Sequence, residues 1–205
     1  MNKLHKFTLI GLAPVALILS GCASGGGSRN ASYIDSAGPN TIVSLDQINI
    51  QDWSNAADQM VQSMLDSGVL QRAPEQPAIL VISRITNNTT QQVDIDELTK
   101  KIRVALNRSG KVVTTTTFGP AGQVEDPIAR QTGELERFQS GDTATMPLPY
   151  FSLSGKLLEN RAQAGRTKQV TYTFQLSLTE IKNGLAVWED EVQITKQGER
   201  AAVGW

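Results

Sequence analysis

The sequence contains almost no cysteine or histidine. Cys22 is the single cysteine and His5 the single histidine among 205 residues, so the chain beyond Cys22 has neither. A Ser-His-Asp triad, a cysteine nucleophile and the usual zinc ligand sets all need these residue types. The enzymatic chemistry that remains is that of carboxylates and of Lys or Ser nucleophiles, and we expect no metal or cofactor.

An excess of charge of one sign is also absent. Nineteen Lys and Arg residues oppose 20 Asp and Glu residues, which gives a formal net charge of −1. The chain therefore lacks the basic field that holds nucleic acid. This balance neither requires nor excludes a protein partner. The length and the 40% hydrophobic content suffice for one domain with a core, and not for two.

The apolar run near the N-terminus is too short to cross a bilayer. Lys3 and Lys6 precede the run Phe7–Leu19, which has the length of the apolar region of a signal peptide. The run ends in Leu19–Ser20–Gly21–Cys22, which resembles the bacterial lipobox. That resemblance implies an S-diacylglycerol on Cys22, cleavage before it and N-acylation of the new amine. The alternative is a secreted protein with an isolated cysteine.

The residue after the cysteine bears on the destination of such a lipoprotein. Ala23 stands where the usual inner-membrane retention signal has Asp, which favours sorting to the outer membrane. Several acyl chains form a stable anchor, whereas one binds only marginally. We therefore expect a protein that is lipid-anchored in the outer membrane, with its domain facing the periplasm.

The rest of the chain divides into a tether and a domain. We assign residues 1–21 to the signal peptide, 22–51 to the lipidated Cys22 and a flexible tether, and 52–205 to a single globular domain. The first part of the tether is rich in Gly, Ser, Ala and Asn, which is typical of flexible linkers. Its second half, Thr41–Ile50, contains apolar residues, and we expect it to pack on the domain.

Hydrophobic periodicity predicts three helices and five strands in the domain. The helices run from an Asp52 or Ser54 cap to about Ser67, over Ile95–Arg108 with Asp94 as cap, and from an Asp126 cap to about Gln139. The strands are Ala78–Ile85, Lys111–Thr117, Pro149–Leu158, Lys168–Ile181 and Leu185–Lys196. The first three strands alternate with helices and the last three follow one another. This order predicts an α/β (α+β) fold, a mixed sheet of four to five strands flanked by about three helices.

The turn between the last two strands tests the register. Asn183–Gly184 favours a two-residue type I′ hairpin, which would place Leu178 opposite Glu189. A three-residue loop over 182–184, with Gly184 in the left-handed conformation, moves the register by one and brings apolar residues opposite each other. We therefore predict a type I turn with a G1 bulge. The pairs are then Ile181 with Leu185, Leu178 with Trp188, Phe174 with Val192 and Tyr172 with Ile194.

Four segments in serial order carry a family resemblance. They are RITNNTTQQVDIDELTKKIRVALNRSGKV, ELERFQSG, YFSLSGKL and YTFQLSLTEIKNGLAVWEDE. Together with the lipobox, this order resembles the LpoB family of outer-membrane lipoproteins, which activate bifunctional class A penicillin-binding proteins. The match covers roughly residues 52–196. It implies a fold similar to the N-terminal domain of TolB and a partner bound through the regulatory domain of the synthase. The Gly/Ser tether of this chain departs from the long proline-rich linker of enterobacterial members.

Three surfaces are candidate contacts for a partner. One of them, the apolar, proline-bound segment Met146–Pro147–Leu148–Pro149, is more often a structural lead-in to a strand than a docking site. Phe118, Gly119 and Pro120 place an aromatic side chain in a rigid loop, where it either anchors a partner or closes the edge of the core. Arg161, Arg166 and Lys168 surround a hairpin loop, which either meets an acidic partner or peptidoglycan carboxylates or is simply solvated.

These observations favour a non-enzymatic activator of a peptidoglycan synthase, with no small-molecule substrate. Glu134 and Glu136 are two apart on a predicted helix and point to different sides, whereas glycan cleavage needs two convergent carboxyls. The alternative function is that of a structural or secretion-associated outer-membrane lipoprotein related to curli-pore components. That alternative predicts a ring or another oligomer.

Overall fold

The computed structural model describes residues 32–36, 38–117, 125–141 and 148–199. The chain divides into two compact units, Met1–Tyr33 and Ile34–Trp205, and the helices and strands that the structure describes belong to the second. Phe118, Gly119, Pro120 and Cys22 lie outside the described residues. The elements are α1 (Ile50–Asp66), the short 3-10 helix η1 (Val69–Arg72), β1 (Ala78–Asn88), α2 (Ile95–Arg108), β2 (Val112–Thr114), α3 (Pro127–Ser140), β3 (Phe151–Ala164), β4 (Thr167–Glu180) and β5 (Leu185–Glu199).

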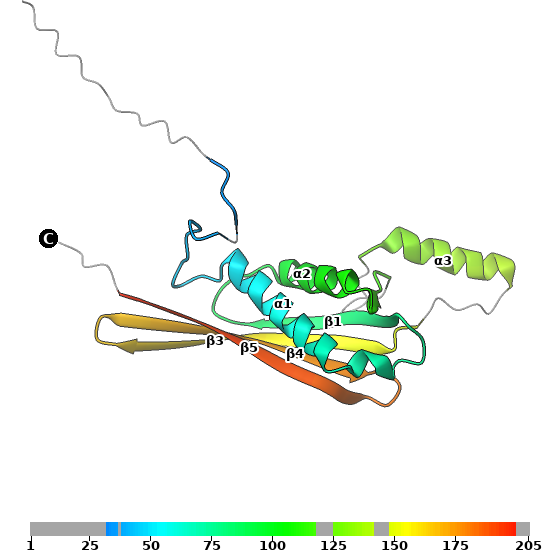
Figure 1. Ribbon diagram of the computed structural model, residues 1–205. Helices are drawn as coiled ribbons and strands as arrows, with labels where there is room; N and C mark the ends of the chain where they lie inside the picture. Colours follow the sequence, from blue (N-terminus) through cyan, green and yellow to red (C-terminus); the bar gives the residue numbers. More distant parts are fainter. Residues whose placement is uncertain (1–31, 37, 118–124, 142–147, 200–205) are drawn as a thin grey trace, which may run out of the picture. The chain divides into compact units, whose positions relative to one another are not determined.

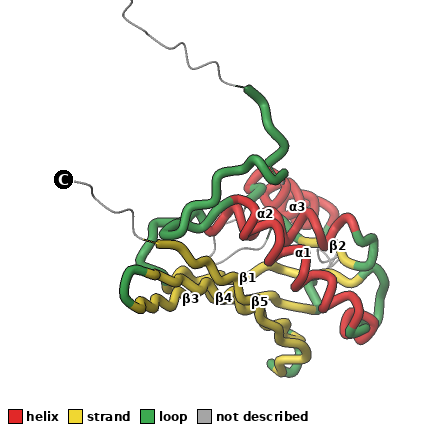
Figure 2. The backbone as a smooth tube through the Cα atoms, turned by 60° about the vertical axis from the view of Figure 1, so that its left-hand side comes forward, coloured by secondary structure: helices red, strands yellow, loops and turns green. Residues whose placement is uncertain are grey.

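A mixed five-stranded sheet with the order β2-β1-β3-β4-β5 forms the base of the domain (Figure 1). β1 is parallel to both β2 and β3, and β3, β4 and β5 are antiparallel. Figure 2 shows α1 and α2 on the same face of this sheet. The predicted α+β fold with a mixed sheet and three helices is confirmed. Among the described residues, no helix is long and apolar enough to span a membrane.

The helix caps follow the sequence in two cases of three. Asp94 and Asp126 accept hydrogen bonds from the first-turn amides of α2 and α3, as predicted. The prediction of Asp52 or Ser54 as the cap of α1 is wrong, because Asn49 holds that position. Asp52 lies three residues further on, and its carboxylate accepts the Asn49 amide at 2.7 Å. A carboxylate in the first helical turn satisfies the same free amides as a cap, so the residue type alone does not fix the first residue of the helix.

The core lies between α1, α2 and the sheet. From Val170 to Glu180, every second residue of β4 is buried, which explains the strict alternation of this stretch in sequence. Trp53 of α1 meets Phe174 of β4 edge to face, with ring centroids 5.6 Å apart. The largest fully buried side chains are Tyr172, Phe151, Phe174, Met60, Met64, Leu80, Leu98, Ile102, Leu106, Leu153, Leu157 and Leu176.

The β4–β5 hairpin confirms the predicted register and corrects the predicted turn. Leu178 pairs with Trp188, and the apolar pairs beyond it follow as predicted. The loop, however, consists of residues 181–184 and is closed by a 2.9 Å hydrogen bond from the Gly184 amide to the Glu180 carbonyl. Glu180, not Ile181, pairs with Leu185, and Val187 is the extra residue of a bulge. Packing of the apolar faces sets the register, and a bulge absorbs the additional residue.

Several strands differ in length from their predictions. β1 continues to Asn88 through residues predicted as a turn, because Asn87 and Asn88 pair with Leu157 and Leu158 of β3. β3 and β5 also run longer than predicted, and β2 is shorter. The β3–β4 hairpin therefore extends beyond the helices (Figure 1).

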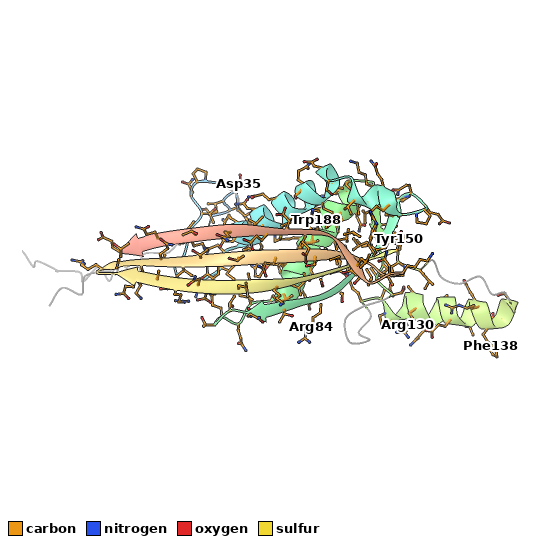
Figure 3. All side chains as sticks on the ribbon, turned by 90° about the horizontal axis from the view of Figure 1, so that it is seen from below. Asp35, Arg84, Arg130, Phe138, Tyr150 and Trp188 are labelled. Atoms are coloured by element: carbon orange, nitrogen blue, oxygen red, sulfur yellow. The ribbon has the colours of Figure 1, made fainter. Side chains whose placement is uncertain are left out.

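α3 differs most from its neighbours. Its sequence places Ile128, Leu135 and Phe138 on one face, yet all three are exposed and the helix has no buried residue. Figure 3 shows Phe138 near the end of α3 that lies away from the sheet. The apolar face of α3 thus lies outside the core.

Candidate partner-binding surfaces

Residues 44–49, here called the strap, lie against the end of β5 and connect the domain to the preceding chain. The Lys196 ammonium of β5 donates to the carbonyls of Ser44 and Gln47, at 3.2 and 2.8 Å, and to the Asn49 side chain. Its charge is balanced by Asp52, whose carboxylate lies 2.5 Å away. Lys196 is only 8% exposed, and its ammonium also lies 5.5 Å from the centre of the Tyr172 ring. One buried lysine therefore joins the strap, α1 and β5.

Further contacts hold the strap from two other elements. The Arg161 guanidinium of β3 pairs with Asp46 at 2.9 Å. The Ile48 amide donates to Gln91, which in turn donates to the Tyr172 hydroxyl at 2.6 Å. We call this end of the sheet, where β3 ends and β4 begins, the tether end. The chain preceding residue 44 leaves the domain here, and the opposite end of the sheet is the distal end.

The predicted basic hairpin lies at the tether end, but its three residues differ in their contacts. Arg161 is engaged with Asp46 and Glu159. Arg166 is exposed in the turn and Lys168 is half-buried in β4, and neither makes a hydrogen bond or ion pair with any residue that the structure describes. Of the three, Arg166 and Lys168 are therefore left to contact a partner.

Glu159 connects this hairpin to the loop after β1. Its side chain is 3% exposed, and it accepts hydrogen bonds from Arg161 and from the amide and hydroxyl of Thr90. Burial alone would raise the pKa of Glu159. The hydrogen bonds from Arg161 and Thr90 outweigh that effect and hold the pKa below its ordinary value.

The distal end carries apolar side chains in solvent. Leu148, Ile181 and Leu185 are 68%, 45% and 59% exposed. The Ile181 amide donates to the Tyr150 carbonyl at 3.0 Å, so the residues before β3 lie beside the β4–β5 turn. We call Leu148, Tyr150, Ile181 and Leu185 the distal patch. Figure 3 places Tyr150 at the end of the sheet opposite the β3–β4 turn.

A covered carboxylate lies beside the distal patch. The Glu180 side chain is 9% exposed and pairs with Arg72 of η1 at 3.3 Å. A hydrogen bond from Tyr150 lowers the pKa of Glu180, and Arg72 lowers it further. The same hydrogen bond raises the pKa of Tyr150. These contacts hold the aromatic ring of the patch beside a charged pair.

An open groove of about 600 Å³ runs between α1 and α2. Its floor is apolar, with Val61, Leu65 and Val104, and Lys100 and Lys101 lie on its rim. Both lysines have partners, since Lys100 pairs with Glu125 and Lys101 donates to Ser54. Within the described part of the chain, no cluster of His, Cys, Asp and Glu could hold a metal ion.

Sequence reasoning missed the distal patch. Ile181 and Leu185 were expected to pair with each other as ordinary strand residues, whereas the 181–184 loop places Ile181 in the turn. Two large apolar residues immediately flanking a Lys-Asn-Gly turn were the available signal, because turn tips are normally polar. Leu148 belongs to the segment 146–149, which the sequence marks as a candidate surface but favours as a structural lead-in to a strand; residues 146 and 147 lie outside the described residues, and Leu148 is exposed.

Comparisons with known proteins give one family and several structures of low identity. A family model described as the peptidoglycan-synthase activator LpoB matches residues 52–194. No curated protein matches the chain. The LpoB C-terminal domain from Salmonella enterica is 17% identical, with a TM-score of 0.43, and the alignment covers 70% of this chain and 98% of that one. The NMR structure of E. coli LpoB is 16% identical, with a TM-score of 0.39 and coverage of 95% and 96%. The lipoprotein GNA1162 from Neisseria meningitidis is 14% identical, with a TM-score of 0.35 and coverage of 62% and 88%.

The family match carries the functional conclusion. It spans well over half of the chain and nearly all of the helices and strands. Activators of this family are non-catalytic, so the prediction that the protein is not an enzyme is confirmed. Their partner is a peptidoglycan synthase, and their place is the cell envelope. The chain belongs to the LpoB family of peptidoglycan-synthase activators.

Proposed function

We propose that this protein is an outer-membrane lipoprotein that binds the regulatory domain of a class A penicillin-binding protein and stimulates its synthesis of peptidoglycan. Residues 1–21 are removed as a signal peptide, and Cys22 then carries the S-diacylglycerol and the N-acyl chain. Residues 22–51 connect the lipid to the globular domain of residues 52–205. The observation that carries this proposal is the family match over residues 52–194.

Binding alone is sufficient for this activity. An activator without catalytic groups raises the rate of its partner by preferring the active conformation of that partner. The shift in the conformational equilibrium cannot exceed the difference in affinity for the two conformations. The domain therefore needs one surface that distinguishes the active synthase, and no substrate pocket.

The strap sets the reach of the domain. Since residues 44–49 are held by Lys196 and Arg161, the tether between the lipid on Cys22 and the strap is at most residues 23–43. Within it, the Ser36 carbonyl also accepts a hydrogen bond from Gln51 of α1. Fully extended, this segment spans about 70 Å at about 3.3–3.6 Å per residue. Relaxed, it spans about 25 Å if it behaves as a Gly-rich chain. The strap therefore lies within this distance of the outer membrane, and the length of the domain adds to the reach of its far end.

Two of the surfaces proposed from the sequence, the 118–120 loop and the basic hairpin, remain candidates for contacts. Phe118, Gly119 and Pro120 would contribute an aromatic anchor. Arg166 and Lys168 would meet carboxylates of the partner or of peptidoglycan, and Arg161 would support them by fixing the hairpin through Asp46 and Glu159.

Reconstitution with a purified synthase tests the proposal. We expect the wild-type protein to bind a class A penicillin-binding protein from the same cell envelope and to raise its rate of glycan polymerisation. Binding without any change in rate would contradict the role of activator. Labelled palmitate should enter the wild-type protein and not Cys22→Ser, and equal labelling would contradict the anchor. A ring-shaped oligomer in size-exclusion chromatography would instead support the secretion-associated alternative.

A further inference from the structure

We infer that the distal patch is the surface on which the synthase docks, with Tyr150 at its centre and Leu148, Ile181 and Leu185 around it. This inference rests on the proposed function, since it names the surface through which that activation is transmitted. It assigns the patch to a protein partner with an apolar surface, and not to the lipid bilayer or to a second copy of the chain.

The aliphatic side chains of the distal patch are exposed to solvent, and nothing in the fold requires them to be. Most large apolar residues of the sheet are buried against the helices, whereas Leu148, Ile181 and Leu185 are each at least 45% exposed at one end. These residues are close in the fold, because Ile181 bonds to the Tyr150 backbone and Leu185 pairs with Glu180. Contiguous exposed apolar surface is characteristic of binding sites.

The distal patch is held in one conformation by hydrogen bonds before any partner binds. The 181–184 loop is closed by the Gly184–Glu180 bond and by a 3.0 Å bond from the Leu185 amide to the Asn183 side chain. The Tyr150 amide is bonded to the Ile79 carbonyl at 2.9 Å, and its hydroxyl to Glu180. A preformed surface loses little conformational entropy on binding, which favours affinity.

The residue types in and beside the distal patch are typical of protein interfaces. Tyr and Arg are among the residues that most often dominate binding energy at protein interfaces, typically inside a ring of less important contacts. Here Tyr150 and Arg72 share one carboxylate, Glu180, and the Arg72 side chain remains 54% exposed. Arg72 can therefore donate its remaining N–H groups to an acceptor on the partner, while the aliphatic side chains exclude water around it.

The choice of occupant follows from where the chain leaves the domain. The strap fixes the exit at the tether end, and only residues 23–43 lie between it and Cys22. The distal patch is at the opposite end of β3 and β4, each of which is 14 residues long. The described chain before the strap thus leaves the domain at the end away from the distal patch. The partner that the family match gives, a peptidoglycan synthase, is the protein that we assign to this surface.

A pair of matched double variants tests the assignment in the full-length lipoprotein. Ile181→Asp with Leu185→Asp places two charges in the distal patch. Ile42→Asp with Val43→Asp places two charges on residues before the strap that are more exposed than Ile181 and Leu185, at 84% and 62%. Affinity for a detergent-solubilised class A penicillin-binding protein and the rate of glycan polymerisation are measured for each, after equal urea midpoints have been established.

We expect the distal variant to lose at least tenfold in affinity, with a parallel loss of activation, and the Ile42/Val43 variant to stay within twofold of wild type. Leu148 lies before β3 and outside the sheet ladder, so Leu148→Asp serves as the second test if the first variant folds poorly. It should weaken binding as well. Wild-type affinity in both distal variants, while the wild-type protein binds and activates, would overturn the inference and leave the proposed function intact.

Three further outcomes would contradict the assignment of the distal patch to the synthase. Loss of binding in Phe138→Asp of α3, with the distal variants unaffected, would assign the docking surface to α3. A wild-type protein that neither binds nor activates the synthase would remove the proposed function and this inference together. Concentration-dependent dimerisation that Ile181→Asp with Leu185→Asp abolishes would assign the patch to a second copy of the chain.

Discussion

The tether end and the distal end use the same pair of residue types in opposite ways. Each has a covered glutamate with a lowered pKa beside an arginine, Glu159 with Arg161 and Glu180 with Arg72. At the tether end, Arg161 and Lys196 are engaged by the strap. At the distal end, the pair lies beside apolar side chains that nothing in the described chain covers. Similar electrostatics thus attach a segment at one end and present a surface at the other.

The largest effect is expected from removing the buried cation of the tether end. Lys196→Ala leaves the Asp52 carboxylate buried without its counter-ion and leaves the carbonyls of Ser44 and Gln47 without a donor. Breaking a buried ion pair on one side costs about 3–5 kcal/mol. Urea denaturation should show a loss of this size in the free energy of unfolding.

The matched control for this variant is at the distal end. Lys182→Ala removes a lysine that is exposed in the 181–184 loop, and its free energy of unfolding should stay within about 0.5 kcal/mol of wild type. Equal losses in the two variants would show that the strap is not held by Lys196, and the contrast between the two ends would disappear.

β3 runs from the distal end to the tether end of the sheet. Adding a single methyl group at Gly155 of this strand should destabilise the domain. A Cβ at Gly155 would lie 2.5 Å from the Gln175 carbonyl oxygen and 2.7 Å from the Leu176 side chain. Gly155→Ala therefore requires β3 and β4 to move apart, at a cost of about 1–3 kcal/mol. Thermal unfolding should reveal it, with Ser154→Ala as the control on the neighbouring residue. An unchanged melting temperature would mean that the ladder adapts without loss.

The sequence predicted the elements that have a clear cap or a strong hydrophobic periodicity. α2 begins and ends as predicted because an aspartate caps an amphipathic stretch, and β4 follows from its alternation. The register of β4 on β5 followed from matching apolar faces. Element ends were less accessible, since the extension of β1 to Asn88 depends on its partner strand β3, which follows only after α2, β2 and α3.

The candidate surfaces were harder to predict for a related reason. Sequence marks charged hairpins such as the one at Arg166 directly, whereas exposed apolar residues look like core residues. Phe138 and Leu185 both match a periodic pattern, and only the absence of a packing neighbour reveals them as surface. The strap was predicted in part. The apolar residues of Thr41–Ile50 indicated a segment that packs on the domain, which is confirmed, but its polar partners Arg161 and Lys196 lie far from it along the chain and had no signal in sequence.

The two glutamates allow the ends to be compared by their dependence on pH. Both pKa values are lowered on folding, so the native state binds fewer protons than the unfolded state at acidic pH. Their contribution to stability is present above the ordinary pKa of about 4.5 and is lost as the pH falls through the folded-state values. Glu159→Gln and Glu180→Gln should each make the loss of stability between pH 6 and pH 3 smaller than in wild type. Urea midpoints across this range check it.

Removing a hydrogen-bond donor of one glutamate, with the glutamate left in place, compares the two ends more sharply. The hydrogen bond from Tyr150 is the main cause of the lowered pKa of Glu180, so Tyr150→Phe should reduce the pH dependence as Glu180→Gln does. Tyr150→Phe should leave the Glu159 contribution intact. A steeper acid dependence in any of these variants would contradict the assignment of the lowered pKa values.

The smallest effect on folding, and the most direct test of the basic hairpin, is expected at Arg166. Arg166→Glu reverses an exposed charge that makes no hydrogen bond or ion pair with a described residue, so its free energy of unfolding should change by less than about 0.5 kcal/mol. If the hairpin meets carboxylates of peptidoglycan, retention on purified sacculi should fall, and raising the salt concentration should lower wild-type retention in the same way. Arg84→Glu, an equally exposed charge reversal on β1, controls for net charge. If the hairpin meets peptidoglycan and the distal patch alone docks the synthase, affinity for the synthase should be unchanged in both variants. A loss of synthase affinity in Arg166→Glu alone would move the docking surface to the tether end.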